Sequence, residues 1–155
     1  MTERSVTHST FVIERTYDAP PARVFAAWAS LEAKTQWFGS GLDSDNFREF
    51  DFRVGGREAW HGEVHGSTFS YDATYQDIVQ DERIVYAYDM HMNDQRISVS
   101  LSTVEIEAVD GGTHLTYTEQ GAFLDGLDEP DKRQEGTETL LDNLGKAVTG
   151  EHANA

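Results

Sequence analysis

The sequence predicts an α+β domain that combines an antiparallel β-sheet with a long C-terminal helix. Three observations indicate this class. Apolar and polar residues alternate with a period of two from about residue 46 to 120, a pattern typical of strands. Two consecutive prolines precede a pair of short helical patterns near the N-terminus, and an apolar stripe with helical spacing lies near the C-terminus.

The first strand is expected over residues 10–17, because alternate apolar residues share one face there. Pro20 should stay non-helical, since a residue that precedes proline avoids the helical region, and Pro21 should occupy the first helical position. The apolar face of this short helix consists of Val24, Phe25 and Trp28.

Ser30 is expected to cap a second short helix directly after the first. One side of this helix carries Leu31, Lys34, Trp37 and Phe38, and Gly39 and Gly41 should end it. Two short helices in a corner suit a segment that bridges the sheet edges and closes one end of a barrel.

The following strands form an antiparallel meander with turns at Gly55-Gly56, near Gly66, at Asp81-Glu82, at Asn93-Asp94 and at Gly111-Gly112. The inward rows are predicted as Phe69, Tyr71, Ala73, Tyr75, Asp77 and Val79; then Ile84, Tyr86, Tyr88 and Met90; then Ile97, Val99 and Leu101; and finally Leu115, Tyr117 and Glu119. A β-bulge near Thr103 would explain why Val104 and Ile106 change parity. Ser98, Ser100 and Ser102 are accordingly expected on the solvated outer face.

A final helix is expected over residues 131–148. Its second half carries one continuous apolar stripe, made of Leu140, Leu141, Leu144, Ala147 and Val148. The first half, RQEGTET, is polar and small. That half either lines an internal space or is simply exposed to solvent.

Composition limits the partners. The 155 residues suffice for one domain, residues 1–155, with a structured core from about 10 to 149 and flexible termini. The net charge of -16 argues against nucleic acid and anionic membranes as partners and is otherwise a solubility feature. No signal segment or membrane-length apolar run is found, and cysteine is absent, so we expect a cytoplasmic protein. A homodimer is left open.

Segments along nearly the whole chain resemble one known family. ERTYDAPPARVFAAWASLEAKTQWF, FDFRVGG, YQDIVQDERIVYAYDM, GTHLTYTEQGAF and GTETLLDNLGKAV are similar to the family named for homology to the activator of the ATPase of heat-shock protein 90. That family belongs to the START-like (SRPBCC, Bet v-like) proteins. The resemblance implies their helix-grip fold, in which a curved antiparallel sheet wraps around the C-terminal helix, often with a pocket between them.

Two positions depart from the family pattern. Many relatives carry a polar residue in place of Pro20 and a tryptophan in place of Thr137. A threonine at position 137 would enlarge or reshape whatever space the helix covers. The chaperone activator also has an additional N-terminal region that contacts its partner, and we find no counterpart here. The resemblance therefore implies a fold and a cavity, with a chaperone partner only as a lesser alternative.

An inward set of large side chains is the main candidate for a ligand cavity. Tyrosines suit such a wall because each combines a large apolar ring with a hydroxyl that needs a partner. Plain core packing is the alternative. The predicted cavity residues are Trp37, Phe38, Trp60, Phe69, Tyr71, Tyr75, Tyr86, Tyr88, Met90, Tyr117 and Glu119.

Glu119 is the candidate catalytic residue. Its parity points inward, so the carboxylate must be paired or have a raised pKa, and Arg15 is the predicted partner. Glu119 could orient a ligand hydroxyl or act as a general acid or base. It could equally be half of a structural ion pair.

No metal site or cofactor is predicted. His61 and His65 lie four residues apart, roughly 13 Å along an extended strand, and His91 shares the outer face with Asp89. Gly55-Gly56 lacks the helix and lysine of a phosphate loop, and there is no nucleophile-elbow motif.

Three functions follow from these observations. The leading hypothesis is a protein that binds a small, largely apolar molecule in an internal cavity. The first alternative is a cofactor-free enzyme of the cyclase, aromatase or hydrolase kind that uses the same cavity. The second is a module that stimulates a chaperone ATPase.

Overall fold

The computed structural model describes residues 4–38 and 44–150. The strands in this part of the chain are β1 (Val6–Tyr17), β2 (Phe47–Phe50), β3 (Arg57–Val64), β4 (Ser67–Val79), β5 (Arg83–Met92), β6 (Gln95–Val109) and β7 (Gly112–Leu124). The helices are α1 (Pro21–Ala29), α2 (Leu31–Lys34), the single 3₁₀ turn η1 (Ser44–Asn46) and α3 (Pro130–Thr149). None of these helices is both long and apolar enough to cross a membrane.

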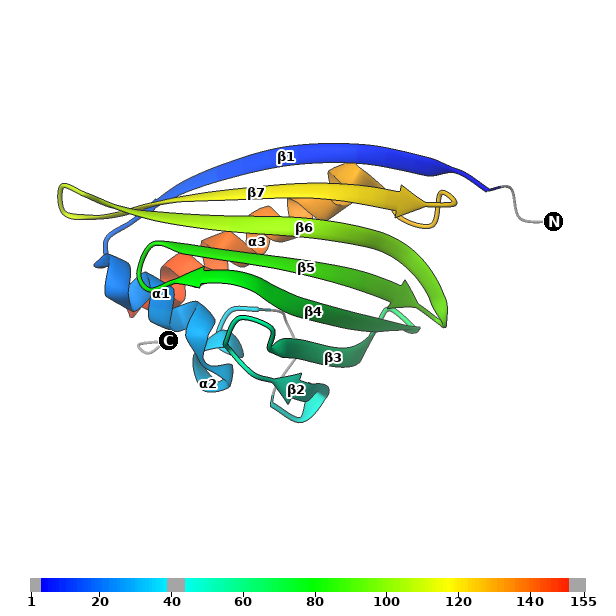
Figure 1. Ribbon diagram of the computed structural model, residues 1–155, viewed down its shortest axis with the longest axis horizontal. Coiled ribbons are helices and arrows are strands. Elements are labelled where there is room, and N and C mark those ends of the chain that lie inside the picture. Colours follow the sequence, from blue (N-terminus) through cyan, green and yellow to red (C-terminus); the bar gives the residue numbers. More distant parts are fainter. Residues whose placement is uncertain (1–3, 39–43, 151–155) are drawn as a thin grey trace.

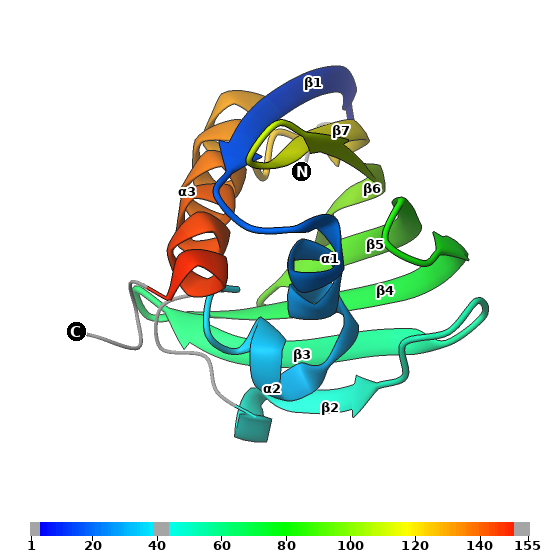
Figure 2. The same ribbon diagram turned by 90° about the vertical axis from the view of Figure 1, so that its left-hand side faces the viewer.

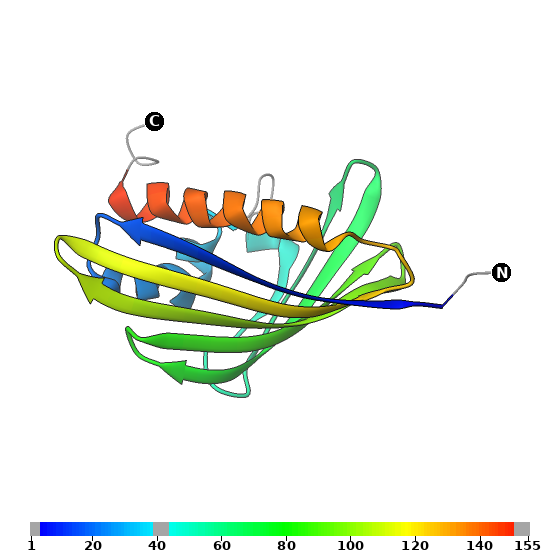
Figure 3. The same ribbon diagram turned by 90° about the horizontal axis from the view of Figure 1, so that it is seen from above.

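The strands form one seven-stranded antiparallel sheet in the order β1-β7-β6-β5-β4-β3-β2 (Figure 1). The sheet curves around α3, which lies along its concave side, while α1 and α2 sit at one end of the trough (Figures 2 and 3). The predicted α+β helix-grip arrangement is therefore confirmed.

β1 is longer than predicted. It begins at Val6 instead of Thr10 and pairs with β7 along its whole length, from Val6 opposite Leu124 to Tyr17 opposite Thr113. Its buried residues alternate as expected, and they are Phe11, Ile13 and Tyr17. The additional residues of β1 can pair because β7 also extends beyond Gln120, as far as Leu124. The length of β1 therefore depends on its partner strand β7.

The connection between β1 and α1 has the conformation that the two prolines predict. Pro20 is extended, with φ -70° and ψ 156°, and Pro21 opens α1. Ser30 ends α1 and caps α2, because its Oγ accepts a hydrogen bond from the Ala33 amide at 3.1 Å. α2 already ends at Lys34, and the predicted end at Gly39 and Gly41 lies outside the described residues.

The predicted turns lie between the strands. Several of their residues adopt the left-handed region that favours glycine, asparagine and aspartate. These residues are Gly55, Gly66, Asp81, Asn93, Asp94 and Gly111.

The predicted inward row of β6 is confirmed at Ile97, which is buried, and wrong beyond it. Val99 and Leu101 are 44% and 38% exposed, whereas Ser98, Ser100 and Ser102 are buried. Met90 pairs with Ser98 but His91 pairs with Arg96, so the irregularity lies at Ile97. Pairing continues without a shift past Thr103, where the bulge was expected.

Hydrogen bonds explain how Ser98 and Ser102 can be buried, whereas the hydroxyl of Ser100 has no hydrogen-bond partner among the described residues. Ser98 accepts from Arg133 at 2.8 Å, and Ser102 is 2.8 Å from the Tyr117 hydroxyl. A hydropathy pattern assigns serine to the solvent side because it contains no information about these partners.

A second irregularity alters the end of β4. Tyr71, Ala73 and Tyr75 are buried as predicted, but the pairing shifts between Tyr75 and Asp77. Asp77 consequently bonds Arg83 at the surface, and Ile78 packs against the core in its place. The predicted inward positions of Asp77 and Val79 are thus not those that the strand adopts.

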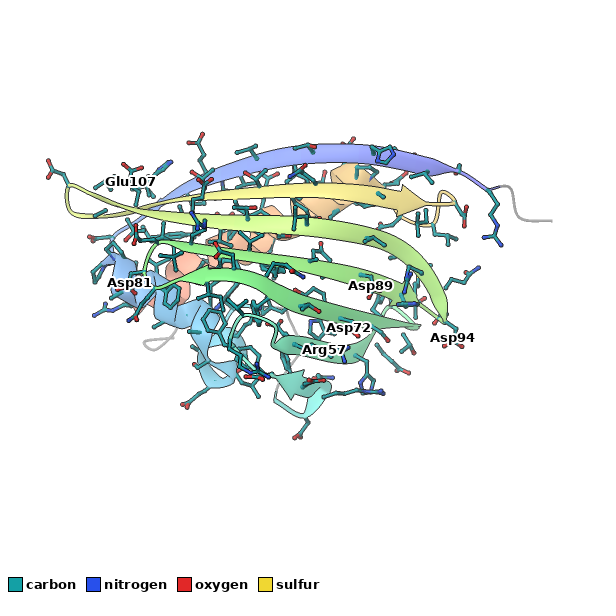
Figure 4. The ribbon with its side chains drawn as sticks, viewed as in Figure 1. Arg57, Asp72, Asp81, Asp89, Asp94 and Glu107 are labelled. Atoms are coloured by element: carbon teal, nitrogen blue, oxygen red, sulfur yellow. The ribbon has the colours of Figure 1, made fainter. Side chains whose placement is uncertain are left out.

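The convex face of the sheet is charged. Asp72 on β4 and Asp89 on β5 are directly opposite one another, an arrangement that destabilises a sheet when it is uncompensated (Figure 4). Arg57 from β3 pairs with Asp72, and Arg96 from β6 lies 3.0 Å from Asp89. The flanking strands therefore neutralise this acidic pair.

α3 packs along its C-terminal half. Leu141, Leu144 and Val148 are buried, and the Tyr17 hydroxyl donates to the Leu141 carbonyl at 2.7 Å. Gly150 ends the helix in the left-handed conformation. The N-terminal half does not pack in this way, and it forms part of the site described next.

Candidate functional site

A cavity of about 740 Å³ lies between the concave face of the sheet and the N-terminal half of α3. Its wall is largely aromatic. The lining residues are Trp28, Trp37, Phe38, Trp60, His65, Phe69, Tyr71, Tyr86, Tyr88, Met90, Ile97, Tyr117, Asp128, Lys132, Arg133, Gly136, Thr137, Leu140 and Leu141.

Nine of the eleven residues predicted for a cavity lie on this wall, namely Trp37, Phe38, Trp60, Phe69, Tyr71, Tyr86, Tyr88, Met90 and Tyr117. Tyr75 and Glu119 do not line it. Both carry their polar atoms one layer behind the rings, where each belongs to a buried hydrogen-bond network.

The rings of the wall pack on one another. Trp60 and Tyr71 are stacked, with centroids 5.4 Å apart and planes 12° apart. Tyr71 also contacts Tyr88 at 4.9 Å and Phe38 at 5.7 Å between centroids. Such contacts hold each ring in a defined orientation, so the wall is preformed.

Glu119 is buried beneath the wall and accepts hydrogen bonds from two of its tyrosines. The Tyr117 hydroxyl donates to Oε1 at 2.7 Å, and the Tyr88 hydroxyl donates to Oε2 at 2.9 Å. Ser102 lies 3.3 Å from Oε1. The carboxylate therefore fixes the phenol groups from behind.

The predicted partner of Glu119 is wrong. Arg15 lies instead at the edge of the sheet, where its Nε donates to Asp142 of α3 at 2.8 Å. The cation nearest to Glu119 is Arg133, whose Nη1 lies 3.5 Å from Oε2. β1 is an edge strand, so the long side chain of Arg15 can reach around to the outer flank of the helix.

Arg133 connects α3 to the sheet and also lines the cavity. Its guanidinium donates to Tyr88 at 2.9 Å, to Ser98 at 2.8 Å and to Asp128 at 2.8 Å, with only 10% of the side chain exposed. The pattern analysis missed this residue. A signal existed, because the stripe of Leu141, Leu144 and Val148 continues backwards at helical spacing through Thr137 to Arg133.

A second buried pair lies behind the other aromatic residues. Nζ of Lys34 and the Tyr75 hydroxyl both donate to Oε1 of Glu58, each at 2.6 Å. Burial lowers the pKa of Lys34, and the neighbouring Glu58 opposes that change. Nζ also lies 4.3 Å from the ring centroid of Phe38, so the pair supports the wall. The sequence contained a signal for this pair. Lys34 precedes Trp37 by three residues, a helical spacing, and Glu58 precedes Trp60 by two, a strand spacing, so each charged residue shares a face with a predicted cavity residue.

The histidines in the described part of the chain do not form a cluster. His61 bonds Arg48 at 2.9 Å, while His65 lies on the cavity lining, which was not predicted. Within residues 4–38 and 44–150, no group of three or more histidine or acidic side chains is arranged to hold a metal ion.

Comparisons with known proteins agree with this architecture. An uncharacterised protein from Rhizobium leguminosarum has 46% sequence identity and a TM-score of 0.90, covering 96% of this chain and 99% of its own. Protein Mll3558 from Rhizobium loti has 48% identity and a TM-score of 0.84, covering 93% of this chain and 99% of its own. Protein CV1439 from Chromobacterium violaceum shares the fold at 23% identity and a TM-score of 0.75, covering 90% of this chain and 96% of its own.

A search of curated proteins finds no match. The sequence model of the family described as "Activator of Hsp90 ATPase homolog 1-like protein" matches residues 18–149. That span includes both short helices, the central strands and α3. The chain therefore belongs to the family of activator of Hsp90 ATPase homolog 1-like proteins.

Proposed function

We propose that this protein binds a small, largely apolar molecule in the cavity between the sheet and α3. The observation that carries the proposal is the cavity volume of about 740 Å³, lined largely by aromatic and other apolar side chains. Ligand cavities are typically about 300–1,000 Å³, mostly apolar, with a few convergent polar groups. Arg133 and Asp128 supply such groups here.

Two further features support a space that is kept open. A side-chain carbon added at Gly136 would meet no atom within 4 Å. The adjacent Thr137 donates its hydroxyl to the Arg133 carbonyl at 2.8 Å, so its polar atom is satisfied within the helix. Small residues at these two positions leave the cavity accessible beside α3.

We propose binding in preference to the enzyme alternative. Glu119, the candidate acid or base, lies behind Tyr88 and Tyr117 and is not among the lining residues, so a bound molecule would not contact it directly. We also propose that the chain acts as one domain in the cytoplasm.

The test is direct titration with a neutral apolar probe, N-phenyl-1-naphthylamine, whose own fluorescence rises in an apolar site. The wild type should bind the probe, and its melting temperature should rise because the probe binds the folded state. Thr137→Phe should fill part of the cavity and weaken binding at least several-fold. Thr139→Phe is the matched control, because Thr139 makes the same bond to the carbonyl four residues back but is exposed. An unchanged affinity in Thr137→Phe, or no binding by the wild type, would contradict the proposal.

A further inference from the structure

One end of the cavity is charged, whereas the remainder is aromatic. Two lysine or arginine side chains line it, Lys132 and Arg133, and both belong to the first turns of α3. Asp128, in the loop before the helix, faces the same end. A ligand that fills the cavity therefore meets rings along most of its length and a guanidinium at one end.

Asp128 shows which group fits that guanidinium. Its Oδ2 accepts from Nη2 of Arg133 at 2.8 Å, the geometry of a charge-assisted hydrogen bond. The side chain of Asp128 is 25% exposed and belongs to a loop, whereas that of Arg133 is 10% exposed. A carboxylate is thus already present, and it belongs to a loop and not to a strand or helix. Its other oxygen, Oδ1, accepts a hydrogen bond from the Glu129 amide at 2.8 Å, and a ligand carboxylate need replace only the bond from Oδ2 to Arg133.

The second carboxylate near Arg133, that of Glu119, cannot be displaced by a ligand in this way. Glu119 is fixed from three sides by Tyr88, Tyr117 and Ser102. The N-terminus of α3 adds its positive dipole end to the same region. The net charge of -16 is spread over the surface and is screened beyond about 8 Å at physiological salt, so the local groups dominate.

We propose that the cavity recognises an aromatic or polycyclic carboxylic acid, whose carboxylate exchanges with Asp128 on Arg133 while its ring system lies against the aromatic wall. This inference rests on the proposed function and deepens it. The stacked pair of Trp60 and Tyr71 offers a flat surface for a planar ring. The recognition is reversible and involves no covalent step.

The experiment compares 2-naphthoate with 2-naphthamide, which has the same ring but no charge. All three tryptophans of the chain line the cavity, so their intrinsic fluorescence reports occupancy. At neutral pH the wild type should prefer the acid several-fold, less than a new hydrogen bond to a charged group would give, because the ligand carboxylate replaces the bond that Asp128 makes to Arg133. Arg133→Gln should abolish the preference.

Asp128→Asn removes the competing charge. It should raise the affinity for 2-naphthoate several-fold and leave that for 2-naphthamide unchanged. Asp131→Asn is the control, since it removes the same charge from an exposed position in the first turn of α3. The comparison of Asp128→Asn with Asp131→Asn tests whether a ligand carboxylate replaces Asp128, even if Arg133→Gln does not fold.

The outcomes separate the two proposals. Equal affinities for acid and amide in the wild type, or no gain for the acid in Asp128→Asn, would overturn the carboxylate inference and leave the cavity as a binding site for neutral molecules. A wild type that binds none of 2-naphthoate, 2-naphthamide and N-phenyl-1-naphthylamine would overturn both proposals together.

Discussion

The Nζ atom of Lys34 lies 2.6 Å from Oε1 of Glu58, and the two side chains are 1% and 0% exposed. Removal of one member of such a pair leaves an unpaired charge away from water. Lys34→Met should therefore lower the free energy of unfolding by about 3–5 kcal/mol in urea titrations.

Two controls make this prediction specific. Lys34→Met combined with Glu58→Gln should recover most of the loss, because glutamine keeps an acceptor for Tyr75 without the charge. Arg53→Met breaks an ion pair of the same 2.6 Å length that is exposed, and it should cost about 0–1 kcal/mol. Equal losses from the buried and exposed pairs would show that burial is not the cause.

Alkaline pH should unfold the protein and ionise its tyrosines in the same transition. Burial raises the pKa of all six above the ordinary value of 10.0. The unfolded chain loses these protons near pH 10 while the folded chain retains them. The contribution of the protonated tyrosines to the free energy of unfolding is therefore fully present below about pH 10, and it is lost as the pH rises further.

The measurement is tyrosinate absorbance followed alongside circular dichroism. Both signals should change in one transition above about pH 10. A tyrosinate signal that appears while the circular dichroism stays native would mean that some of the phenols reach solvent in the folded protein.

Two glycines of α3 should respond oppositely to alanine. At Gly145 the new carbon would lie 2.9 Å from the ring of Tyr17, which its bond to Leu141 holds in place. Gly145→Ala should destabilise by about 1–3 kcal/mol. Gly136→Ala meets open space and should stabilise the helix by about 0.5–1 kcal/mol. Thermal melts of the two variants test this, and the same sign for both would contradict the packing of α3.

Glu119→Gln distinguishes a structural role from a catalytic one. Glutamine presents a donor where one of the two tyrosine hydroxyls needs an acceptor, so stability should fall by about 1–3 kcal/mol. Binding of a neutral apolar probe should change less than threefold, because Glu119 does not line the cavity. A variant of native stability that loses a measurable turnover would instead support the catalytic alternative.

Alternation predicted most of the strand residues that line the cavity, because it depends on local geometry. In β5 the residues Ile84, Tyr86 and Tyr88 face inward as predicted, since side chains of a regular strand must alternate. The same rule failed in β6, where the irregularity at Ile97 exchanged the faces of the serines and of Val99. A bulge depends on how two strands pair, and one strand's composition contains too little information to locate it.

The sequence by itself determined the order of the elements and the corner after β1. Pro20, Pro21 and Ser30 act on their own backbone or on an amide three residues away, so their effects are local. It also indicated that the first half of α3 is too polar for a dry core. Composition alone could not distinguish a cavity from solvent.

Only the tertiary structure decided which charges meet. Glu119 pairs with Arg133 of α3 instead of Arg15, and Lys34 meets Glu58 across the end of the trough. Ion pairs depend on the distance between side chains after folding. The curved sheet brings Glu119 of β7 close to Arg133 near the start of α3, while Arg15 of the edge strand β1 meets Asp142 further along the same helix. The polar end of the cavity is therefore a product of curvature, which no periodicity in the chain encodes.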